Sequence, residues 1–374
     1  MTSRIAVISP FLFRATRGVE RFTVFLANAL SAGGDRVEVF AWRVPQMIQW
    51  QDIHPAVRIR LVPYSRYYMS LVASVWYLFW LLLRRYDWLV LFFASHGELP
   101  PVRLASLLRK FRVLVIFQYP PEAAHHQYQA FRAYGIGRHG ETFVSSSTFL
   151  TERVSALLEH PCTLVYNGVN TEWLAPSEEL RSQARAKLGI GTEAPVALVV
   201  AAMEERKGIQ WVVKAMPLVR ARLPQATLLI LGDGPLAPAL RQQAASLELG
   251  SAVRFLGTTN ELKPYYAAAD VGMLLSRGEG MPLVLLEYLA MGLPVITSRH
   301  RPFDELVEER FGVLVDESDE TAVANAMIGL LADAERRRCM SDCARTAAED
   351  RYDWKVIGRQ YCDLLHKDDP LPSR

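Results

Sequence analysis

Two glutamates beside a predicted helix start carry the clearest chemistry in this sequence. Glu279 stands one residue before Gly280 and three before Pro282, and Glu287 follows eight residues after Glu279. Proline suits the first position of a helix because it has no amide hydrogen to leave unpaired, so we expect a helix that begins at Pro282. The free amides at a helix start favour phosphate. The segment therefore predicts a diphosphate site with one carboxylate for sugar hydroxyls and another for ribose hydroxyls.

Other residues suited to a phosphate follow other apolar runs. Lys207 opens a helix after the first strand of the second half, so it can reach a phosphate as a point charge. Arg206 can do the same through its forked guanidinium. The alternative is a solvated charge cluster at 204–207, which suits Arg206 better than Lys207. Gly232 begins a strand-to-helix turn, which is good evidence for a tight turn and weak evidence for a phosphate loop. Gly18 opens a helix in the first half and is predicted to face the same diphosphate.

The elements that must position these residues alternate between short apolar runs and amphipathic stretches. In the first half the pattern predicts strands at 5–8, 37–40, 88–93, 113–117, 142–145 and 163–166, and helices at 18–30, 69–84, 103–110 and 148–159. In the second half it predicts strands at 196–201, 227–231, 253–255, 271–274, 295–297 and 312–315, and helices at 208–222, 236–247, 260–268, 282–291, 302–308 and 320–332. A long amphipathic segment, 334–366, follows. Such alternation indicates parallel sheets covered on both faces.

The alternation breaks at 167–176, where Gly, Pro and Asn cluster, and this predicts a link between two domains. A length of 374 residues also fits two domains. We therefore expect an α/β protein of two tandem doubly wound domains facing across a cleft. They are 1–170 and 171–349. Ligands bind outside the carboxyl ends of the strands in such sheets, so each domain would hold one ligand.

Composition and charge restrict the class of protein and its partners. The chain is 51% hydrophobic and 22% charged, which excludes a disordered chain. Residues 1–170 carry 18 Lys and Arg against 10 Asp and Glu, a net charge of +8, and the remainder has a net charge of −5. Domains of opposite charge are expected to have different partners. Four cysteines make no disulfide framework, and the start of the chain does not read as a signal peptide, so we expect the cytoplasm.

One uncharged stretch, 69–83, resembles a membrane segment and is followed by Arg84 and Arg85. It is shorter than the roughly 20 residues that a spanning helix needs. We favour a core helix packed under a sheet, because the stretch is apolar nearly all round. The alternative is a helix lying in a membrane interface, with Trp76, Tyr77 and Trp80 at the level of the headgroups. This alternative predicts an anionic, lipid-linked or membrane-surface acceptor.

Six motifs in the expected order make the chain resemble a known family, the retaining glycosyltransferases of family 4, which have the two-domain GT-B fold. They are Gly18-Val19-Glu20, Asn167-Gly168-Val169-Asn170, Lys207-Gly208, Gly232-Asp233-Gly234-Pro235, the segment 253–257, and Glu279-Gly280-Met281-Pro282 with Glu287. Each motif alone is weak. Together they cover nearly the whole chain, which makes the resemblance specific.

The resemblance implies two Rossmann-like domains and a nucleotide diphosphate sugar as the donor substrate, with no further cofactor. Glu279 would bind the donor sugar, Glu287 the ribose, and Lys207 would neutralise the diphosphate. The diphosphate site would be lined by Gly280, Met281, Pro282 and Leu283, with Gly232 beside it and Gly18 closing over it from the first domain. The chain has no Asp-x-Asp pair, so we predict no metal. The first domain would hold the acceptor, and a C-terminal helix at about 350–374 would pack back onto it. We expect no nucleic acid partner.

The sequence departs from the family in two places. Two alanines, 201–202, stand where the family usually has an arginine, and we predict that Arg206 replaces it in part. Gln118 stands where many members have a histidine after a strand, and a glutamine donates a hydrogen bond but is no base. His96 at another strand end is a second candidate, and the two histidines at 125–126 are a third.

These observations predict a metal-independent retaining transfer of a hexose to a glycan or lipid-linked acceptor, in the cytoplasm and at the inner face of the membrane. The predicted catalytic side chains are Glu279, Lys207, Arg206, Gln118 and His96. One alternative is an epimerase of the same fold, which would act on a nucleotide sugar without an acceptor. Another is a non-catalytic scaffold. The missing arginine favours the scaffold, and the two retained glutamates count against it.

Overall fold

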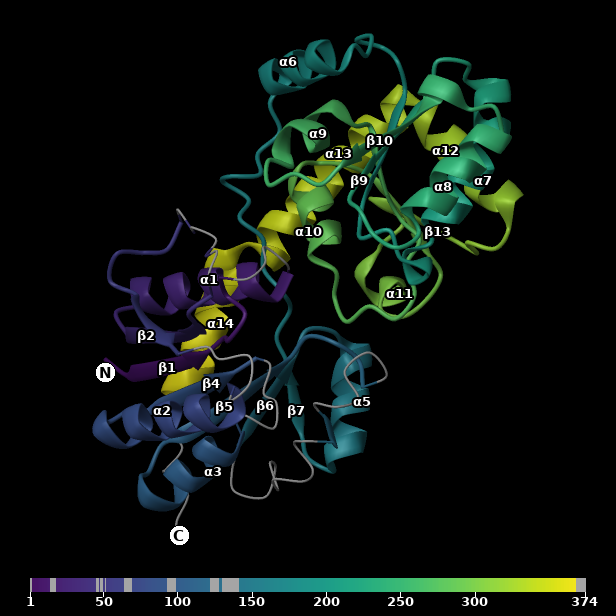
Figure 1. Ribbon diagram of the computed structural model, residues 1–374. Coiled ribbons are helices and arrows are strands. Elements are labelled where there is room, and N and C mark those ends of the chain that lie inside the picture. The colour runs from purple at the N-terminus through teal and green to yellow at the C-terminus, as the bar shows by residue number, and fades with distance from the viewer. Residues whose placement is uncertain are drawn as a thin grey trace. The chain divides into compact units, whose positions relative to one another are not determined.

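The protein forms two compact units, shown as a ribbon in Figure 1. The computed structural model describes residues 2–13, 18–44, 47, 50, 52–63, 69–92, 99–121, 128–129 and 141–367. One unit comprises Met1–Gly168 and Trp354–Arg374, and the other comprises Val169–Asp353. Each contains a parallel sheet with helices, so the predicted α/β class with two Rossmann-like domains is confirmed.

The first unit is built on a parallel sheet that has seven strands within the described residues, in the order β3-β2-β1-β4-β5-β6-β7. The strands are β1 (Arg4–Ile8), β2 (Arg36–Trp42), β3 (Arg58–Val62), β4 (Trp88–Leu91), β5 (Arg112–Phe117), β6 (Thr142–Ser145) and β7 (Cys162–Leu164). The helices are α1 (Gly18–Ala32), α2 (Met69–Leu83), α3 (Leu99–Leu108), α5 (Thr148–Leu158) and α14 (Trp354–His366).

Two hydrophobic cores fill the two faces of this sheet. Helices α2, α3 and α5 share one core with alternate strand residues, and α1 and α14 share the other. The last helix is held there closely, because the Trp88 indole donates a hydrogen bond to the carbonyl of Leu365 at 2.7 Å. The end of the chain thus packs with its beginning, around α1.

The second unit is built on a parallel sheet of six strands in the described part of the chain, in the order β10-β9-β8-β11-β12-β13. The strands are β8 (Val196–Val200), β9 (Thr227–Leu231), β10 (Val253–Gly257), β11 (Val271–Leu274), β12 (Val295–Ser298) and β13 (Gly312–Val315). The helices are α6 (Glu178–Leu188), α7 (Ile209–Arg222), α8 (Ala237–Ser246), α9 (Lys263–Ala268), α10 (Leu283–Ala290), α11 (Phe303–Leu306), α12 (Glu320–Leu331) and α13 (Ala334–Ala347).

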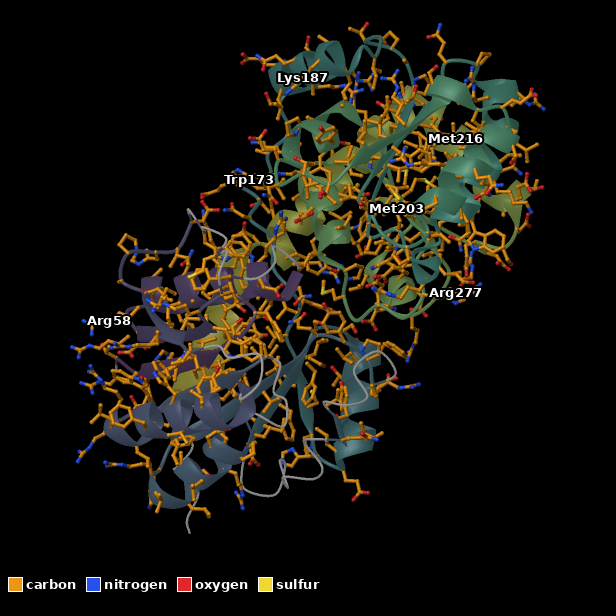
Figure 2. The ribbon with its side chains drawn as sticks, viewed as in Figure 1. Arg58, Trp173, Lys187, Met203, Met216 and Arg277 are labelled. Carbon is orange, nitrogen blue, oxygen red and sulfur yellow. The ribbon has the colours of Figure 1, made fainter. Side chains whose placement is uncertain are left out.

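The two faces of the second sheet are covered by different helices. Helices α7, α8 and α12 share one core with β8, β9 and β11, and the buried Met203 and Met216 belong to it (Figure 2). On the other face Tyr288 of α10 lies over Gly272 of β11, where any larger residue would meet its ring. The Tyr288 hydroxyl donates to the carbonyl of Leu198 at 3.2 Å, which fixes α10 against the sheet.

Several predicted elements differ from the observed ones in their bounds. Helix α3 begins at Leu99 rather than 103, because its prolines fall in the first turn, where a missing amide hydrogen costs nothing. Helix α10 begins at Leu283, and Pro282 is its extended N-cap rather than its first helical residue. The segment 334–366 is two helices, separated at Ala348–Tyr352 by a π-turn. The C-terminal helix predicted at about 350–374 starts at Trp354, and residues after 367 lie outside the described residues.

The sequence analysis missed β3 and α6. Strand β3 is an edge strand in which arginines alternate with apolar residues, so it is no continuous apolar run. Helix α6 is mostly polar and buries only Ala184 and Arg185. Among the helices that the structure describes, none combines the length and the apolar character needed to cross a membrane.

Candidate active site

The predicted donor site lies at the carboxyl edge of the second sheet. Strands β8 and β11 are neighbours, and the order of the strands reverses between them. In doubly wound sheets a ligand binds outside the strand ends at such a reversal. The loop after β8 carries Arg206 and Lys207, and the loop after β11 carries Glu279.

These three side chains meet, although Glu279 lies more than seventy residues after the other two in the chain. The Lys207 ammonium donates a short hydrogen bond to Oε1 of Glu279. Arg206 approaches the same oxygen with Nη1 at 3.4 Å and also binds the carboxylate of Glu204. Glu279 is buried, Lys207 is mostly buried, and Arg206 is about half exposed. Two cations thus donate to the same oxygen of one buried carboxylate.

Two glycines let the loops of this edge come together. Gly208 has φ of +67°, and a Cβ there would lie 2.0 Å from the carbonyl oxygen of Leu275, in the loop after β11. Gly232 has φ of +133°, and a Cβ there would lie 1.9 Å from the carbonyl oxygen of Ala201. No side chain fits either contact. Both glycines therefore serve the close approach of backbones, and this accounts for the turn at Gly232 without a ligand.

The start of α10 lies next to Glu279. Gly280 and Met281 are buried, whereas Pro282 and Leu283 are partly exposed. Pro282 has an extended backbone and accepts a bond from the amide of Leu285 at 3.1 Å. The first amides of α10 and its positive dipole end are thus available beside a carboxylate, which suits an anionic group carrying hydroxyls.

Glu287 is buried on α10 and does not face solvent. The hydroxyl of Tyr266, on α9, donates a short hydrogen bond to its Oε2. The carboxylate therefore has the partner that its apolar neighbours require.

A further polar cluster, which the sequence analysis did not single out, surrounds the buried Glu317. His300 lies 2.8 Å from Oε1 of Glu317, and Arg277 donates to the same oxygen. Burial alone raises the pKa of the Glu317 carboxyl, but hydrogen bonds, including those from His300 and Arg277, hold that pKa below its usual value. Each of the three residues follows the end of β11, β12 or β13 by two or three positions. Because ligands bind outside the carboxyl ends of the strands in such sheets, this position was the signal in the sequence that could have identified them.

The cluster borders the loop that carries Lys207. The amide of Arg277 donates to the carbonyl of Arg206 at 2.8 Å, and the Arg277 side chain extends at the surface of the unit (Figure 2). Glu317 thus anchors one side of the carboxyl edge, next to the candidate site.

The remaining predicted residues lie in the first unit. Gly18 is the first residue of α1, which follows β1, and Gln118 directly follows β5. The amide nitrogen of Gln118 is buried with no hydrogen-bond partner among the described residues. His96 and the histidines at 125–126 lie outside the described residues.

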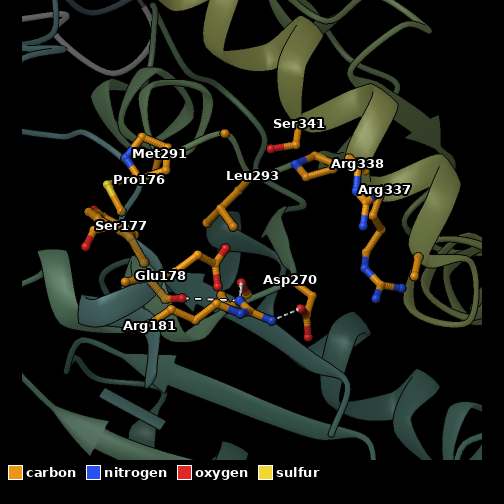
Figure 3. A pocket seen from close by; sticks show the side chains of 16 residues that line it. Pro176, Ser177, Glu178, Arg181, Asp270, Met291, Leu293, Arg337, Arg338 and Ser341 are labelled. Carbon is orange, nitrogen blue, oxygen red and sulfur yellow. Dashed lines mark hydrogen bonds and ion pairs between the residues drawn. The ribbon is translucent and has the colours of Figure 1, made fainter. Parts of the chain in front are cut away.

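The second unit also contains a cavity of about 300 Å³, which Figure 3 shows from close by. Its wall includes Asp270 and Pro294, which precede β11 and β12, so it opens at the amino edge of the sheet. Arg181 in its wall donates to the carboxylate of Asp270, and Arg337 donates to two backbone carbonyls. Two of the three arginines in its wall are thus engaged by groups of the protein itself, and we assign no ligand to this cavity.

Comparisons with known proteins find matches for both halves of the chain. The family model described as "Glycosyl transferases group 1" matches residues 194–333 of this chain. The family model described as "Glycosyltransferase Family 4" matches residues 16–173. Sucrose-phosphate synthase from Thermosynechococcus elongatus has a TM-score of 0.81 and 22% identity, with 98% of each chain covered. HepE from Anabaena, solved with UDP and glucose, has a TM-score of 0.82 and 18% identity, over 98% of this chain and 100% of that one. These identities show the fold.

Curated relatives are closer in sequence. A GDP-mannose-dependent phosphatidylinositol monomannoside mannosyltransferase of Mycolicibacterium smegmatis is 33% identical over 56% of this chain, and the match spans little more than half of that protein's length, 56%. The lipopolysaccharide core biosynthesis glycosyltransferase LpsE of Rhizobium meliloti is 27% identical over 96% of this chain and 98% of its own length. With both halves matched and a parallel sheet in each unit, the chain belongs to the group 1, family 4-like glycosyltransferases.

Proposed function

We propose that this protein is a retaining glycosyltransferase that moves a hexose from a nucleotide diphosphate sugar to an acceptor. The observation that carries the proposal is the meeting of Lys207 and Arg206 with Glu279 beside the start of α10, at the strand-order reversal of the second sheet. In this proposal the diphosphate lies on the first amides of α10 and on Lys207. Glu279 accepts hydrogen bonds from sugar hydroxyls, and Glu287 from ribose hydroxyls.

The proposed reaction breaks the bond between C1 of the sugar and the diphosphate oxygen, and the bonding electrons leave with the diphosphate. The acceptor hydroxyl oxygen forms its bond to C1 on the same face, and its proton passes to the departing diphosphate. This route needs no histidine at the position of Gln118. Lys207, Arg206 and the α10 amides offset the charge that develops on the leaving group, so we propose that no metal takes part.

The acceptor in this proposal is a lipid-linked or cell-surface glycan, reached in the cytoplasm at the inner membrane face. The names of two relatives support it, since one acts on a phosphatidylinositol monomannoside and another in lipopolysaccharide core biosynthesis. The net charge of +8 on residues 1–170 also suits an anionic acceptor or surface.

A direct test is to incubate the protein with UDP- and GDP-hexoses, first selected by thermal shift, and to follow the sugar by NMR. An α-linked product from an α-linked donor would support retention, and an inverted anomer would refute it. Incubation with donor alone separates the alternatives. Epimerised donor would identify an epimerase, whereas donor binding without turnover under any acceptor would identify a scaffold.

A further inference from the structure

Helix α2 is apolar all round, yet it buries only one of its sides. Ala73, Tyr77 and Leu81, spaced by four residues, pack into the core under the sheet. The opposite side presents four apolar residues that are 41–60% exposed, namely Val72, Val75, Phe79 and Leu83. Their spacing of three and four residues puts them in one row along the helix. The favoured prediction of a core helix is therefore right for one side and wrong for the other.

Helix α3 repeats this arrangement beside α2. Val102 and Ala105 are buried in the same core, while Leu104, Leu107 and Leu108 are 46–58% exposed. The two helices pack against each other and cover the same face of the sheet. Because both buried sides point to that sheet, both exposed rows point away from it. We call these seven residues of α2 and α3 the α2–α3 ridge.

The ridge is a concentration of exposed apolar surface rather than scatter. Ten large apolar side chains are exposed among the described residues, and seven of them form the ridge. Single exposed apolar residues are ordinary on soluble proteins, but a contiguous apolar surface marks a site of interaction.

Positively charged side chains border the ridge. Arg84 and Arg85 directly follow α2, and Arg109 and Lys110 directly follow α3. The two helix ends are adjacent, since Arg109 donates from Nη2 to the carbonyl of Leu82 at 3.1 Å. Residues 69–121 contain six Lys and Arg against two Asp and Glu. An apolar row ending in a cluster of cations is the pattern of a protein surface that lies in a membrane interface.

We propose that the α2–α3 ridge binds the anionic surface of a lipid bilayer, with the apolar row at the acyl boundary and the four cations at the headgroups. Cations at such positions are attracted to an anionic leaflet, and salt weakens that attraction. A second copy of this chain suits the ridge less well, because it would bring the same cations and no opposite charge. The inference deepens the proposed function, since it names the surface by which the enzyme would reach a lipid-borne acceptor.

Co-sedimentation with vesicles tests the ridge. The full chain should bind vesicles of phosphatidylcholine with phosphatidylglycerol, bind phosphatidylcholine alone weakly, and lose binding as salt rises. Val75→Ser/Phe79→Ser/Leu83→Ser should weaken binding at least tenfold, about 1.4 kcal/mol. Its control is Trp173→Ser/Leu218→Ser, which changes exposed apolar residues of the second unit and should bind normally. These substitutions are all at exposed positions, and circular dichroism checks the fold.

A variant with reversed charges tests the contribution of the cations beside the ridge. Arg84→Glu/Arg85→Glu should also weaken binding at least tenfold, whereas Lys187→Glu/Arg222→Glu in the second unit should not. Three results would overturn the proposal: no binding of the unchanged chain to anionic vesicles at low salt, equal loss in the variants and their controls, or ridge-dependent dimers in sedimentation velocity without vesicle binding. Donor turnover is measured separately in the unchanged chain. Its absence with vesicle binding intact would refute the glycosyl transfer and leave the ridge standing.

Discussion

The substitution Glu279→Gln tests the donor site most sharply, because it changes one charge and hardly any volume. In the structure one oxygen of Glu279 accepts hydrogen bonds from both Lys207 and Arg206. If this carboxylate also accepts hydrogen bonds from the donor sugar in the transition state, an amide should do so less well. Hydrogen bonds to charged groups are worth about 1.5–3 kcal/mol, so turnover should fall at least tenfold.

The same substitution should act in the opposite direction on the product nucleotide. A nucleoside diphosphate has no sugar hydroxyls to donate to Glu279, so it gains no binding energy from this carboxylate. Its diphosphate instead competes with Glu279 for the Lys207 ammonium. Removing the negative charge frees Lys207 for the diphosphate. Because this pair is mostly buried, it is worth more than the about 1 kcal/mol of an exposed pair, so the nucleotide should bind at least about fivefold more tightly.

The assay combines initial rates with calorimetric titration of UDP and GDP. The matched control is Glu204→Gln, since Glu204 also binds Arg206 but its side chain is 43% exposed, against 9% for Glu279. It should alter both quantities by less than about twofold. Normal turnover in folded Glu279→Gln protein would refute the assignment. Weaker nucleotide binding together with lower turnover would instead mean that Glu279 holds the loop in place.

Three further predictions concern the same site. Lys207→Ala should weaken nucleoside diphosphate binding more than Arg206→Ala, because Lys207 is 14% exposed and Arg206 is 46% exposed; titration measures both, and the reverse order would show that their roles are exchanged. Tyr266→Phe removes the hydroxyl that donates to Glu287 and should raise the donor KM about tenfold with little change in kcat; an unchanged KM would show that Glu287 does not depend on Tyr266 to meet the donor. Chelation with EDTA should leave turnover unchanged, and a loss that Mg²⁺ restores would contradict the metal-free route.

Much of the fold could be predicted from the sequence, because its signals are local. Continuous apolar strands alternating with helices indicated two parallel sheets, and the motifs at Gly18, Lys207 and Glu279 indicated the family. Where local polarity hides an element, prediction failed. Strand β3 pairs with β2 although its arginines break the apolar run, and α6 is nearly all polar.

The site shows the same division between local and long-range information. The sequence by itself determined that Lys207 and Glu279 each follow a buried strand, because strand ends are marked by local composition. Only the tertiary structure decided that β8 lies next to β11, which brings the two side chains into one ion pair. Strand pairing likewise gathers Arg277, His300 and Glu317, which share no local pattern.

Helix α2 gives the last case. Its composition determined an apolar helix. Periodicity could not predict which side is buried, because every side of the helix is apolar. The sheet covers one side of a helix lying on it, so packing alone decided that Tyr77 is buried while Phe79 is exposed. Which side of such a helix faces solvent is a property of its neighbours, and only the folded structure contains them.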